Sequence, residues 1–180
     1  EDFTALAYCL SRIDGLGFYN SGEAAGASQH HKHLQLVPYE SEQGTQPLPI
    51  TAAIAPYRDQ LSDLHRLPQL PFWHSIRQLS PKWADGDRES LGLMLLNQYQ
   101  QIMADLGFDR DTERPAFPYN LLVTREWIMG IRRSQASYQG INVNSLGYAG
   151  WLLVKTADDF DTLRHLGPLK LLAQVGEPRL

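Results

Sequence analysis

The chain has 180 residues, of which 43% are hydrophobic, and its formal net charge is -4 at pH 7. This length and composition are sufficient for the core of a globular protein. The negative charge argues against a general nucleic-acid surface, because binding to a phosphate backbone requires a basic face. A single cysteine, Cys9, excludes an intramolecular disulfide and a zinc site built from several cysteines, which favours a cytoplasmic location. No stretch approaches the roughly 18 apolar residues of a membrane span, so we expect no membrane partner.

The first half of the chain is predicted to mix short helices and strands. Its opening residues, EDFTALAYCLSRI, have apolar side chains at helical spacing, with Asp2 as the expected N-cap. A short strand is predicted at 17–20, and a loop of small residues leads to a second strand at 31–37. Residues 51–71 contain three prolines, which predicts broken helical pieces, and residues 72–80 are typical of a strand.

The second half is predicted to contain the longest helix and a hairpin. The apolar stripe of residues 88–108 predicts a helix that stops at Gly107. Residues 119–124 and 127–132 are predicted to be paired strands joined by a tight turn. A third strand is expected at 148–155.

The C-terminal tail, residues 157–176, is predicted to be helical with an interruption at Gly167 and Pro168. Helices and strands follow one another along the chain without a regular β-α alternation. The sequence therefore favours the α+β class over a doubly wound parallel sheet.

The stretch GASQHHKHLQLVP, residues 26–38, has three histidines within four positions. If the residues alternate as in a strand, His31, His33 and Gln35 share one face and Lys32 points to the other. One interpretation is a metal site made by two of these histidines with a third ligand such as His74. A second is that the histidines only decorate a half-exposed strand.

A third interpretation explains more of the stretch. The small residues 26–29 form a segment whose backbone N–H groups can surround an anion, and Ser28 and Gln29 add side-chain donors. A phosphate held there would lie against His33, whose neutral imidazole has a nitrogen free to attack phosphorus. Fixed donors would take the charge that accumulates on the phosphoryl oxygens.

Three segments of the chain resemble one known family. YNSGEAAGASQHHKHLQLVP is similar to the active-site segment of the histidine triad superfamily, in the transferase branch where His-x-His-x-Gln replaces His-x-His-x-His. YNLLVTREWIMGIRRS and INVNSLGYAGWLLVK resemble the C-terminal region of the diadenosine tetraphosphate phosphorylases, also called ATP adenylyltransferases. The resemblance implies a histidine-triad-like antiparallel sheet with flanking helices.

The resemblance also implies roles for individual residues. His33 would be the nucleophile that becomes adenylylated, His31 a supporting histidine, and Gln35 the donor of an amide to the phosphoryl oxygen. Contacts to the sugar and phosphates of the substrate are implied for residues in both halves of the chain, namely Asn20, Gly26, Ala27, Ser28, Gln29, Asn144, Ser145 and Lys155. No resident metal is implied, although a divalent cation such as Mg²⁺ can accompany the nucleotide.

The implied reaction is the phosphorolysis of diadenosine tetraphosphate to ATP and ADP through an adenylyl group on His33. The partners would be a dinucleoside polyphosphate, ATP, ADP and phosphate. Two alternatives stay open: another nucleotidyltransferase of the hexose-1-phosphate uridylyltransferase type, and a nucleotide-binding regulator without turnover. Arg125, Arg132 and Arg133 suit phosphate contacts or a solvated surface equally, and the sequence leaves the oligomeric state open.

Members of the family are longer at the N-terminus, which implies that the chain is a single-domain fragment over 1–180. Within it we distinguish a histidine-triad motif region at 1–40, connecting helices and a strand at 41–117, and a C-terminal phosphorylase region at 118–180. The part that precedes them would supply strands, loops and a lysine contact of the nucleotide pocket. A separate N-terminal fragment of the same protein is therefore a further expected partner.

Overall fold

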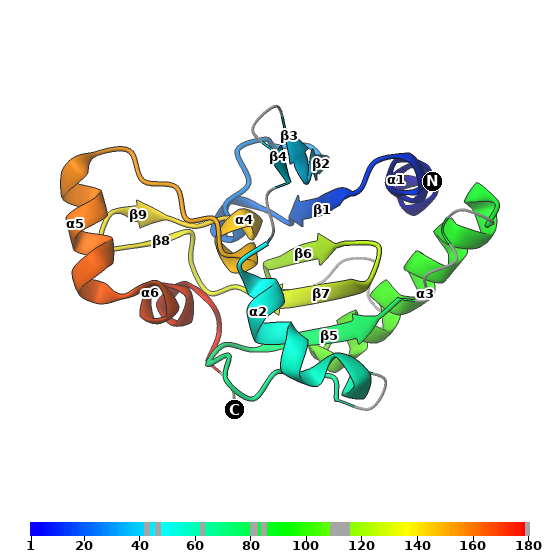
Figure 1. The fold of residues 1–180 in the computed structure, drawn as a ribbon. Coiled ribbons are helices and arrows are strands. Elements are labelled where there is room, and N and C mark those ends of the chain that lie inside the picture. The colour runs from blue at the N-terminus through cyan, green and yellow to red at the C-terminus, as the bar shows by residue number, and fades with distance from the viewer. Residues whose placement is uncertain are drawn as a thin grey trace.

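A computed structural model describes residues 1–41, 44–45, 48–61, 64–79, 83, 86–108 and 116–178 of the chain. Its centre is a five-stranded antiparallel sheet in the order β2-β1-β6-β7-β5 (Figure 1). The strands, in chain order, are β1 (Gly15–Asn20), β2 (Leu34–Pro38), β5 (His74–Gln78), β6 (Tyr119–Val123) and β7 (Trp127–Arg132). Strands from the first, middle and last parts of the chain thus share one sheet.

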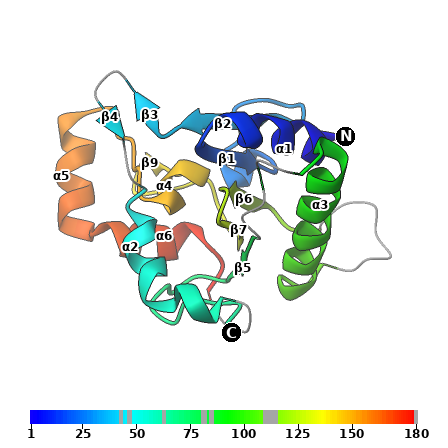
Figure 2. The same cartoon turned by 45° about the vertical axis from the view of Figure 1, so that its right-hand side comes forward.

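Helices cover both faces of this sheet, as Figure 2 shows with the sheet between two layers. One face is packed against α1 (Asp2–Arg12) and α3 (Arg88–Asp105). The other face is packed against α2 (Ile50–Ile54), α4 (Ser145–Ala149) and α6 (Pro168–Val175). Because both faces are covered, all five residues of the central strand β6 are buried.

The remaining elements are short or lie at the periphery. Within the described ranges, no helix combines the length and hydrophobicity that crossing a membrane requires. The short or peripheral elements are η1 (Glu23–Ala25), β3 (Glu40–Ser41), β4 (Gly44–Thr45), η2 (Ala55–Gln60), β8 (Ser137–Tyr138), β9 (Ile141–Asn142) and α5 (Ala157–Leu166).

Several elements agree with the sequence patterns. The predicted long helix is α3, and Gly107 follows it with φ +79°, a conformation that favours glycine. The predicted hairpin is β6 and β7, and the tail is two helices that meet at Gly167. The α+β class is therefore confirmed.

Two local predictions at the N-terminal end are wrong. The strand expected to begin at residue 31 begins at Leu34, because its partner β1 ends at Asn20 and Tyr19 opposite Leu34 is the last pair of the ladder. Asp2 does not cap α1. The N-cap is Glu1, and the Asp2 carboxylate accepts a hydrogen bond from Lys32 instead.

The third strand expected at 148–155 is also wrong, because Ser145–Ala149 is helix α4 and residues 151–154 have no regular structure. Asn144 begins this helix, since its side chain accepts a hydrogen bond from the Leu146 N–H. Gly150, at φ +103°, ends it. The apolar residues after Gly150 favour a strand in the sequence pattern, in spite of the two helix signals at Asn144 and Gly150.

Candidate functional site

The histidine segment lies between η1 and the edge strand β2. The rings of His31 and His33 stack with their centroids 5.8 Å apart and their planes inclined by 27°, and both side chains are exposed. Neither ring is hydrogen-bonded to another of the described residues. The ring of His31 therefore contacts the ring of His33, and the His33 side chain is exposed to solvent.

The two residues that follow His33, Leu34 and Gln35, lie on opposite faces of the sheet. Gln35 lies opposite Phe18 in the β1–β2 ladder, and Leu34 lies opposite Tyr19. Directly paired residues share a face, so Gln35 is on the α4 face and Leu34 on the α1 face. Lys32 is also directed to the α1 side, where its hydrogen bond with Asp2 raises the pKa of the lysine. Both partners are exposed, so this ion pair adds little stability.

The loop that precedes the histidines uses part of its own hydrogen-bonding capacity. The N–H of Gly26 donates to the Glu23 carbonyl at 2.8 Å, and the N–H of Ala27 donates to the Gly22 carbonyl at 3.0 Å. Among the described residues, the backbone N–H groups of Ser28 and Gln29 make no such bond. An anion can therefore be bound by the last two residues of the loop, but not by a nest of all four.

A buried polar network fixes the base of this loop. Asn20 Oδ1 accepts hydrogen bonds from Asn120 Nδ2 at 2.7 Å, from the Ser145 N–H at 2.9 Å and from Ser145 Oγ at 2.6 Å. Asn120 Nδ2 also donates to the Ala25 carbonyl at 2.8 Å. Asn120 and Ser145 are completely buried, so Ser145 supports Asn20 in this structure and is not exposed to a ligand.

Arg133 is the cation of this network and is completely buried. Its guanidinium donates to Asn120 Oδ1 at 2.6 Å and to four carbonyl oxygens, those of Ala25, Gln135, Val143 and Val175. Burial lowers the pKa of Arg133, but a guanidinium remains charged in proteins. Arg133 therefore joins the loop, β6 and the segment before α4. We call Asn20, Asn120, Arg133 and Ser145 the Asn-Arg network.

Two cavities flank the loop. The first, which we call the tyrosine cavity, has a volume of about 760 Å³. It lies on the α1 face and is lined by Asp2, Phe3, Tyr19, Asn20, Ser21, Gly22, Gln29, His30, His31, Lys32, Leu34, Tyr99, Phe117, Tyr119 and Leu121. The second, which we call the lysine cavity, has a volume of about 220 Å³. It is lined by Gly26, Asn142, Val143, Asn144, Gly147, Trp151, Leu152, Leu153, Val154 and Lys155.

The expected catalytic and substrate-binding residues are divided between these cavities. Three of them line the tyrosine cavity, namely Asn20, Gln29 and His31. Three others line the lysine cavity, namely Gly26, Asn144 and Lys155. The structure thus brings the N-terminal loop together with residues more than a hundred positions later. His33, Gln35, Ala27 and Ser28 line neither cavity.

The interpretation of the histidines as a metal site needs a third ligand, and His74 does not supply it. His74 is completely buried; its Nδ1 is 2.8 Å from the Phe72 carbonyl, and its Nε2 accepts the Leu67 N–H at 2.9 Å. Both ring nitrogens are therefore used within the core. Among the described residues, no group of three His, Cys, Asp or Glu side chains is arranged to hold a metal ion.

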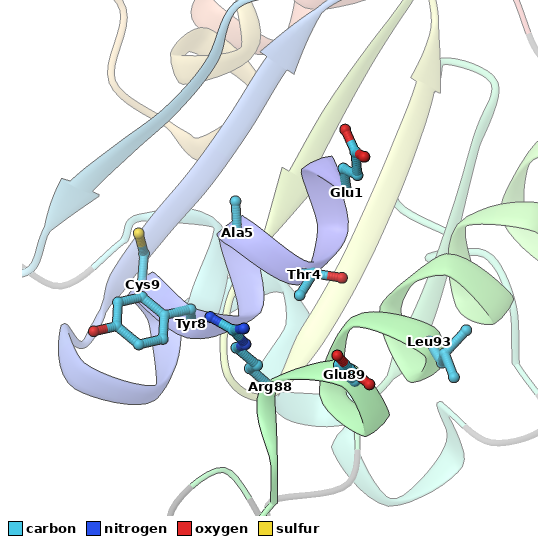
Figure 3. Close-up of a pocket in the computed structure, with 8 residues that line it drawn as sticks. All are labelled: Glu1, Thr4, Ala5, Tyr8, Cys9, Arg88, Glu89 and Leu93. Carbon is cyan, nitrogen blue, oxygen red and sulfur yellow. The ribbon is translucent and has the colours of Figure 1, made fainter.

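A further groove lies between α1 and α3 (Figure 3). Its volume is about 730 Å³, and it contains the free thiol of Cys9. Tyr8 from α1 and Leu93 from α3 contribute exposed apolar surface to it. No residue predicted for the site lines this groove.

The sequence patterns did not identify Asn120 or Arg133 as parts of the site. One signal was available for Asn120: the tripeptides FYN at 18–20 and PYN at 118–120 both occur at strands. In the sheet Asn20 lies directly opposite Asn120. For Arg133 the sequence offered only the alternatives of a phosphate contact and solvated surface, and the structure excludes the second.

Comparison with protein families decides the relationship. A profile described as the Ap4A phosphorylase N-terminal domain matches residues 1–56, and one described as the ATP adenylyltransferase C-terminal domain matches residues 68–178. The chain belongs to the ATP adenylyltransferase family. The resemblance drawn from its sequence motifs is confirmed.

Two curated relatives of this ATP adenylyltransferase family member come from Saccharomyces cerevisiae. Diadenosine 5',5'''-P1,P4-tetraphosphate phosphorylase 2 is 29% identical over 182 residues, which cover 91% of this chain and 52% of the relative. Protein APA1 is 29% identical over 181 residues, which cover 89% and 52%. The chain therefore spans about half the length of the curated relatives that it matches.

Solved structures confirm the fold. The crystal structure of yeast Ap4A phosphorylase Apa2 matches with a TM-score of 0.69 at 25% identity, covering 99% of this chain and 62% of that chain. The same yeast protein in complex with Ap4A matches with a TM-score of 0.63 at 26% identity, covering 93% and 56%. Its complex with AMP matches with a TM-score of 0.61 at 28% identity, covering 92% and 56%.

Proposed function

We propose that this chain carries the catalytic histidine of a nucleotidyltransferase that cleaves diadenosine tetraphosphate with phosphate. The observation that carries the proposal is the exposed His33, stacked on His31 next to a loop whose base the Asn-Arg network holds. Membership of the ATP adenylyltransferase family and the yeast structures with Ap4A and AMP support it. The family match also favours adenylyl transfer over uridylyl transfer.

The reaction consists of two displacements at one phosphorus. A ring nitrogen of His33 attacks the α-phosphorus, so that a P–N bond forms while the P–O bond to the ATP leaving group breaks. Inorganic phosphate then attacks the same phosphorus, the P–N bond breaks and ADP leaves. His33 returns to its neutral form, and the reaction needs no other reactant.

Neighbouring residues have separate roles in this scheme. The amides of Ser28 and Gln29 stabilise the charge on the phosphoryl oxygens, since they make no hydrogen bond to the other described residues. The lysine cavity is lined by Gly26, Asn144 and Lys155 among others. The ammonium group of Lys155 attracts the phosphates that are not transferred. Asn20 accepts a hydrogen bond from the Ser145 hydroxyl and lines the tyrosine cavity.

Gln35 distinguishes a transferase from a hydrolase in this proposal. An amide can donate to the adenylyl group, but it cannot titrate and so cannot act as the base that activates water. We expect Gln35→His to raise the ratio of hydrolysis to phosphorolysis, measured as AMP against ADP formed from the adenylylated protein. An unchanged ratio in this variant would contradict the role given to Gln35.

The proposal is tested by incubating the purified protein with diadenosine tetraphosphate, with and without phosphate, and following the nucleotides formed. We expect ATP and ADP only when phosphate is present, and loss of both in His33→Ala. His165→Ala is the matched control, because His165 is exposed on α5 and lines neither cavity. Symmetric release of two ADP would identify a hydrolase and overturn the proposal.

A further inference from the structure

The Asn-Arg network contains two side-chain amides whose orientation is fixed by groups that cannot exchange donor and acceptor roles. The Ser145 backbone N–H can only donate, and its nitrogen lies 2.9 Å from Asn20 Oδ1. The Arg133 guanidinium can also only donate, and one of its nitrogens lies 2.6 Å from Asn120 Oδ1. The Ala25 carbonyl can only accept, and its oxygen lies 2.8 Å from Asn120 Nδ2. These three groups therefore determine which atom of each amide is oxygen and which is nitrogen.

The two amides are connected in one direction. Asn120 Nδ2 donates to Asn20 Oδ1 at 2.7 Å, and the two residues lie directly opposite each other in the β1–β6 ladder. The Ser145 hydroxyl has one proton, for which Asn20 Oδ1 at 2.6 Å and the Tyr19 carbonyl at 2.8 Å compete. The Nδ2 group of Asn20 makes no hydrogen bond to another described residue. Because the oxygen and the nitrogen of a planar amide point apart, this N–H₂ group is turned away from the network.

Burial makes this arrangement difficult to reverse. Asn120, Arg133 and Ser145 are completely buried, so water cannot replace a lost partner. If the Asn20 amide turned over, its N–H₂ group would face the Ser145 N–H and the Asn120 N–H₂ group, and buried donors would lose their acceptor. Asn20 lines the tyrosine cavity, and it therefore presents a fixed donor there. A fixed donor of this kind binds an acceptor oxygen without reorganisation.

We propose that Asn120 is a positioning residue for substrate binding, which keeps the Asn20 N–H₂ group directed to an acceptor oxygen of the bound dinucleotide. The inference rests on the proposed function, because that reaction supplies the ligand. Asn120 is completely buried and touches no ligand itself, so it acts through Asn20. The direction of the Asn120 amide is set in turn by Arg133. The charge of Arg133 thus fixes the polarity of the amide that meets the substrate.

A change of one atom group in Asn120 reverses this polarity. Asn120→Asp keeps the shape of the side chain and the acceptor for Arg133, but it places an oxygen opposite Asn20 Oδ1. Asn20 can donate to the new carboxylate only by turning its amide over, which directs its oxygen to the substrate. We expect KM for diadenosine tetraphosphate to rise about tenfold, as the loss of one hydrogen bond to a ligand predicts, while kcat stays within about threefold of wild type. Loss of folded protein alone would lower kcat and leave KM unchanged.

A double variant tests whether Asn120 acts through Asn20. Asn20→Ala removes the amide, and we expect it to raise KM about tenfold by itself. Adding Asn120→Asp to Asn20→Ala should then change KM by less than about twofold, because no amide is left to turn over, whereas independent effects would multiply to about a hundredfold. Asn97→Asp is the matched control, because it makes the same chemical change at an exposed position of α3, and its KM should equal that of wild type.

Asn20→Asp decides the question if Asn120→Asp does not fold. This variant leaves the buried side chains in place, and one of its oxygens still accepts from Asn120 and from the Ser145 N–H. Its second oxygen takes the place of the N–H₂ group toward the substrate, so KM should rise at least about tenfold while thermal unfolding stays close to wild type. A wild-type KM in Asn20→Asp would overturn the proposal, since the direction of the amide would then have no effect.

The outcomes separate this inference from the proposed function. If wild-type protein forms no ATP and ADP from the dinucleotide and phosphate, the proposed function fails and the inference fails with it. If wild type is active but folded Asn120→Asp keeps a wild-type KM, only the positioning role of Asn120 is overturned. A fall in kcat without a rise in KM, or KM effects that multiply in the double variant, overturns this role as well, because Asn120 would then act without directing Asn20.

Discussion

Arg133 has no carboxylate partner among the described residues, although it is completely buried. All five of its N–H groups are used, one by an amide oxygen and four by backbone carbonyls. Carbonyl dipoles therefore replace water around the charge. Such a group holds several segments at once. Its removal leaves Asn120 Oδ1 and the carbonyls of Gln135 and Val143 without a donor among the described residues, whereas the Ala25 and Val175 carbonyls keep other donors.

We predict that Arg133→Met lowers the free energy of unfolding by about 3–5 kcal/mol, because several buried acceptors lose their donor and each unsatisfied group costs about 1–3 kcal/mol. Urea denaturation followed by circular dichroism measures the loss. Arg164→Met is the matched control, because Arg164 is exposed on α5 and its ion pair with Asp161 is long, at 3.9 Å. Equal losses in the two variants would show that the contacts of Arg133 carry no special weight.

Gly26 is a second residue whose identity is fixed by its surroundings. Its φ of +84° lies in the left-handed region, and a Cβ on it would come within 2.5 Å of the Val143 carbonyl oxygen. Gly140 has a similar φ of +81°, but nothing lies within 4 Å of its Cβ position.

This pair of glycines separates backbone strain from displacement of the loop. We predict that Gly140→Ala costs about 1–2 kcal/mol through φ alone, and that Gly26→Ala costs more because the loop must also move away from Val143. Only Gly26→Ala should lower kcat for phosphorolysis, since only that loop adjoins His33. Equal kcat values in the two variants would contradict the link between loop position and activity.

The packing of α1 on α3 depends on a close approach of the two helices. A Cβ on Gly92 of α3 would lie 2.6 Å from Thr4 Oγ1 and 2.8 Å from Thr4 Cα of α1. Alanine has the higher helix propensity by about 1 kcal/mol, but here the obstructing atom belongs to the backbone and cannot turn away.

We therefore predict that Gly92→Ala destabilises the protein by about 1–3 kcal/mol, in spite of the gain in helix propensity. Asn97→Ala, at an exposed position of the same helix, should be neutral or slightly stabilising. Thermal unfolding of both variants measures the difference. A Gly92→Ala protein as stable as wild type would show that the helices can separate at no cost.

Elements with local signals were predictable from the sequence. Helix α5 has a complete capping box between Thr156 and Asp159, and α3 has the Asp87 side chain at its N-terminus and Gly107 after its last turn. The strands at 119–123 and 127–132 also follow a local hairpin pattern. In contrast, the start of β2 depends on where β1 ends, and no property of residues 31–33 reveals this.

The candidate site was predictable only in part for the same reason. The histidine motif is continuous, so its residues could be recognised and their alternation used. The Asn-Arg network combines Asn20 with Asn120, Arg133 and Ser145, whose contacts exist only after distant segments pair. The tyrosine cavity likewise takes its rings from four separate elements.

Buried tyrosines predict how the stability of the entire chain depends on pH. Burial is the main cause that raises the pKa of Tyr119 and of Tyr148. A tyrosine whose pKa is higher in the folded than in the unfolded protein contributes stability fully below its unfolded pKa of about 10, and that stability is lost as the pH rises above this value.

We expect the free energy of unfolding to fall steeply above about pH 10 and to fall less steeply in Tyr148→Phe, which removes one of these groups. Tyr8→Phe, at an exposed position, is the control and should retain the wild-type slope. Denaturant titrations between about pH 8 and about pH 11, on both sides of the ordinary tyrosine pKa of about 10, measure the slopes. Identical slopes in all three proteins would contradict the prediction.

The hydrogen bond between Asn20 and Asn120 spans 100 positions of sequence, and this has a consequence for biosynthesis. A ribosome that adds roughly 5–20 residues per second completes the histidine motif several seconds before it reaches the strand that supports it. During this interval the newly made histidine segment has no fixed loop beside it. The Asn-Arg network beside the motif can form only when the segment that contains Asn120, Arg133 and Ser145 has emerged.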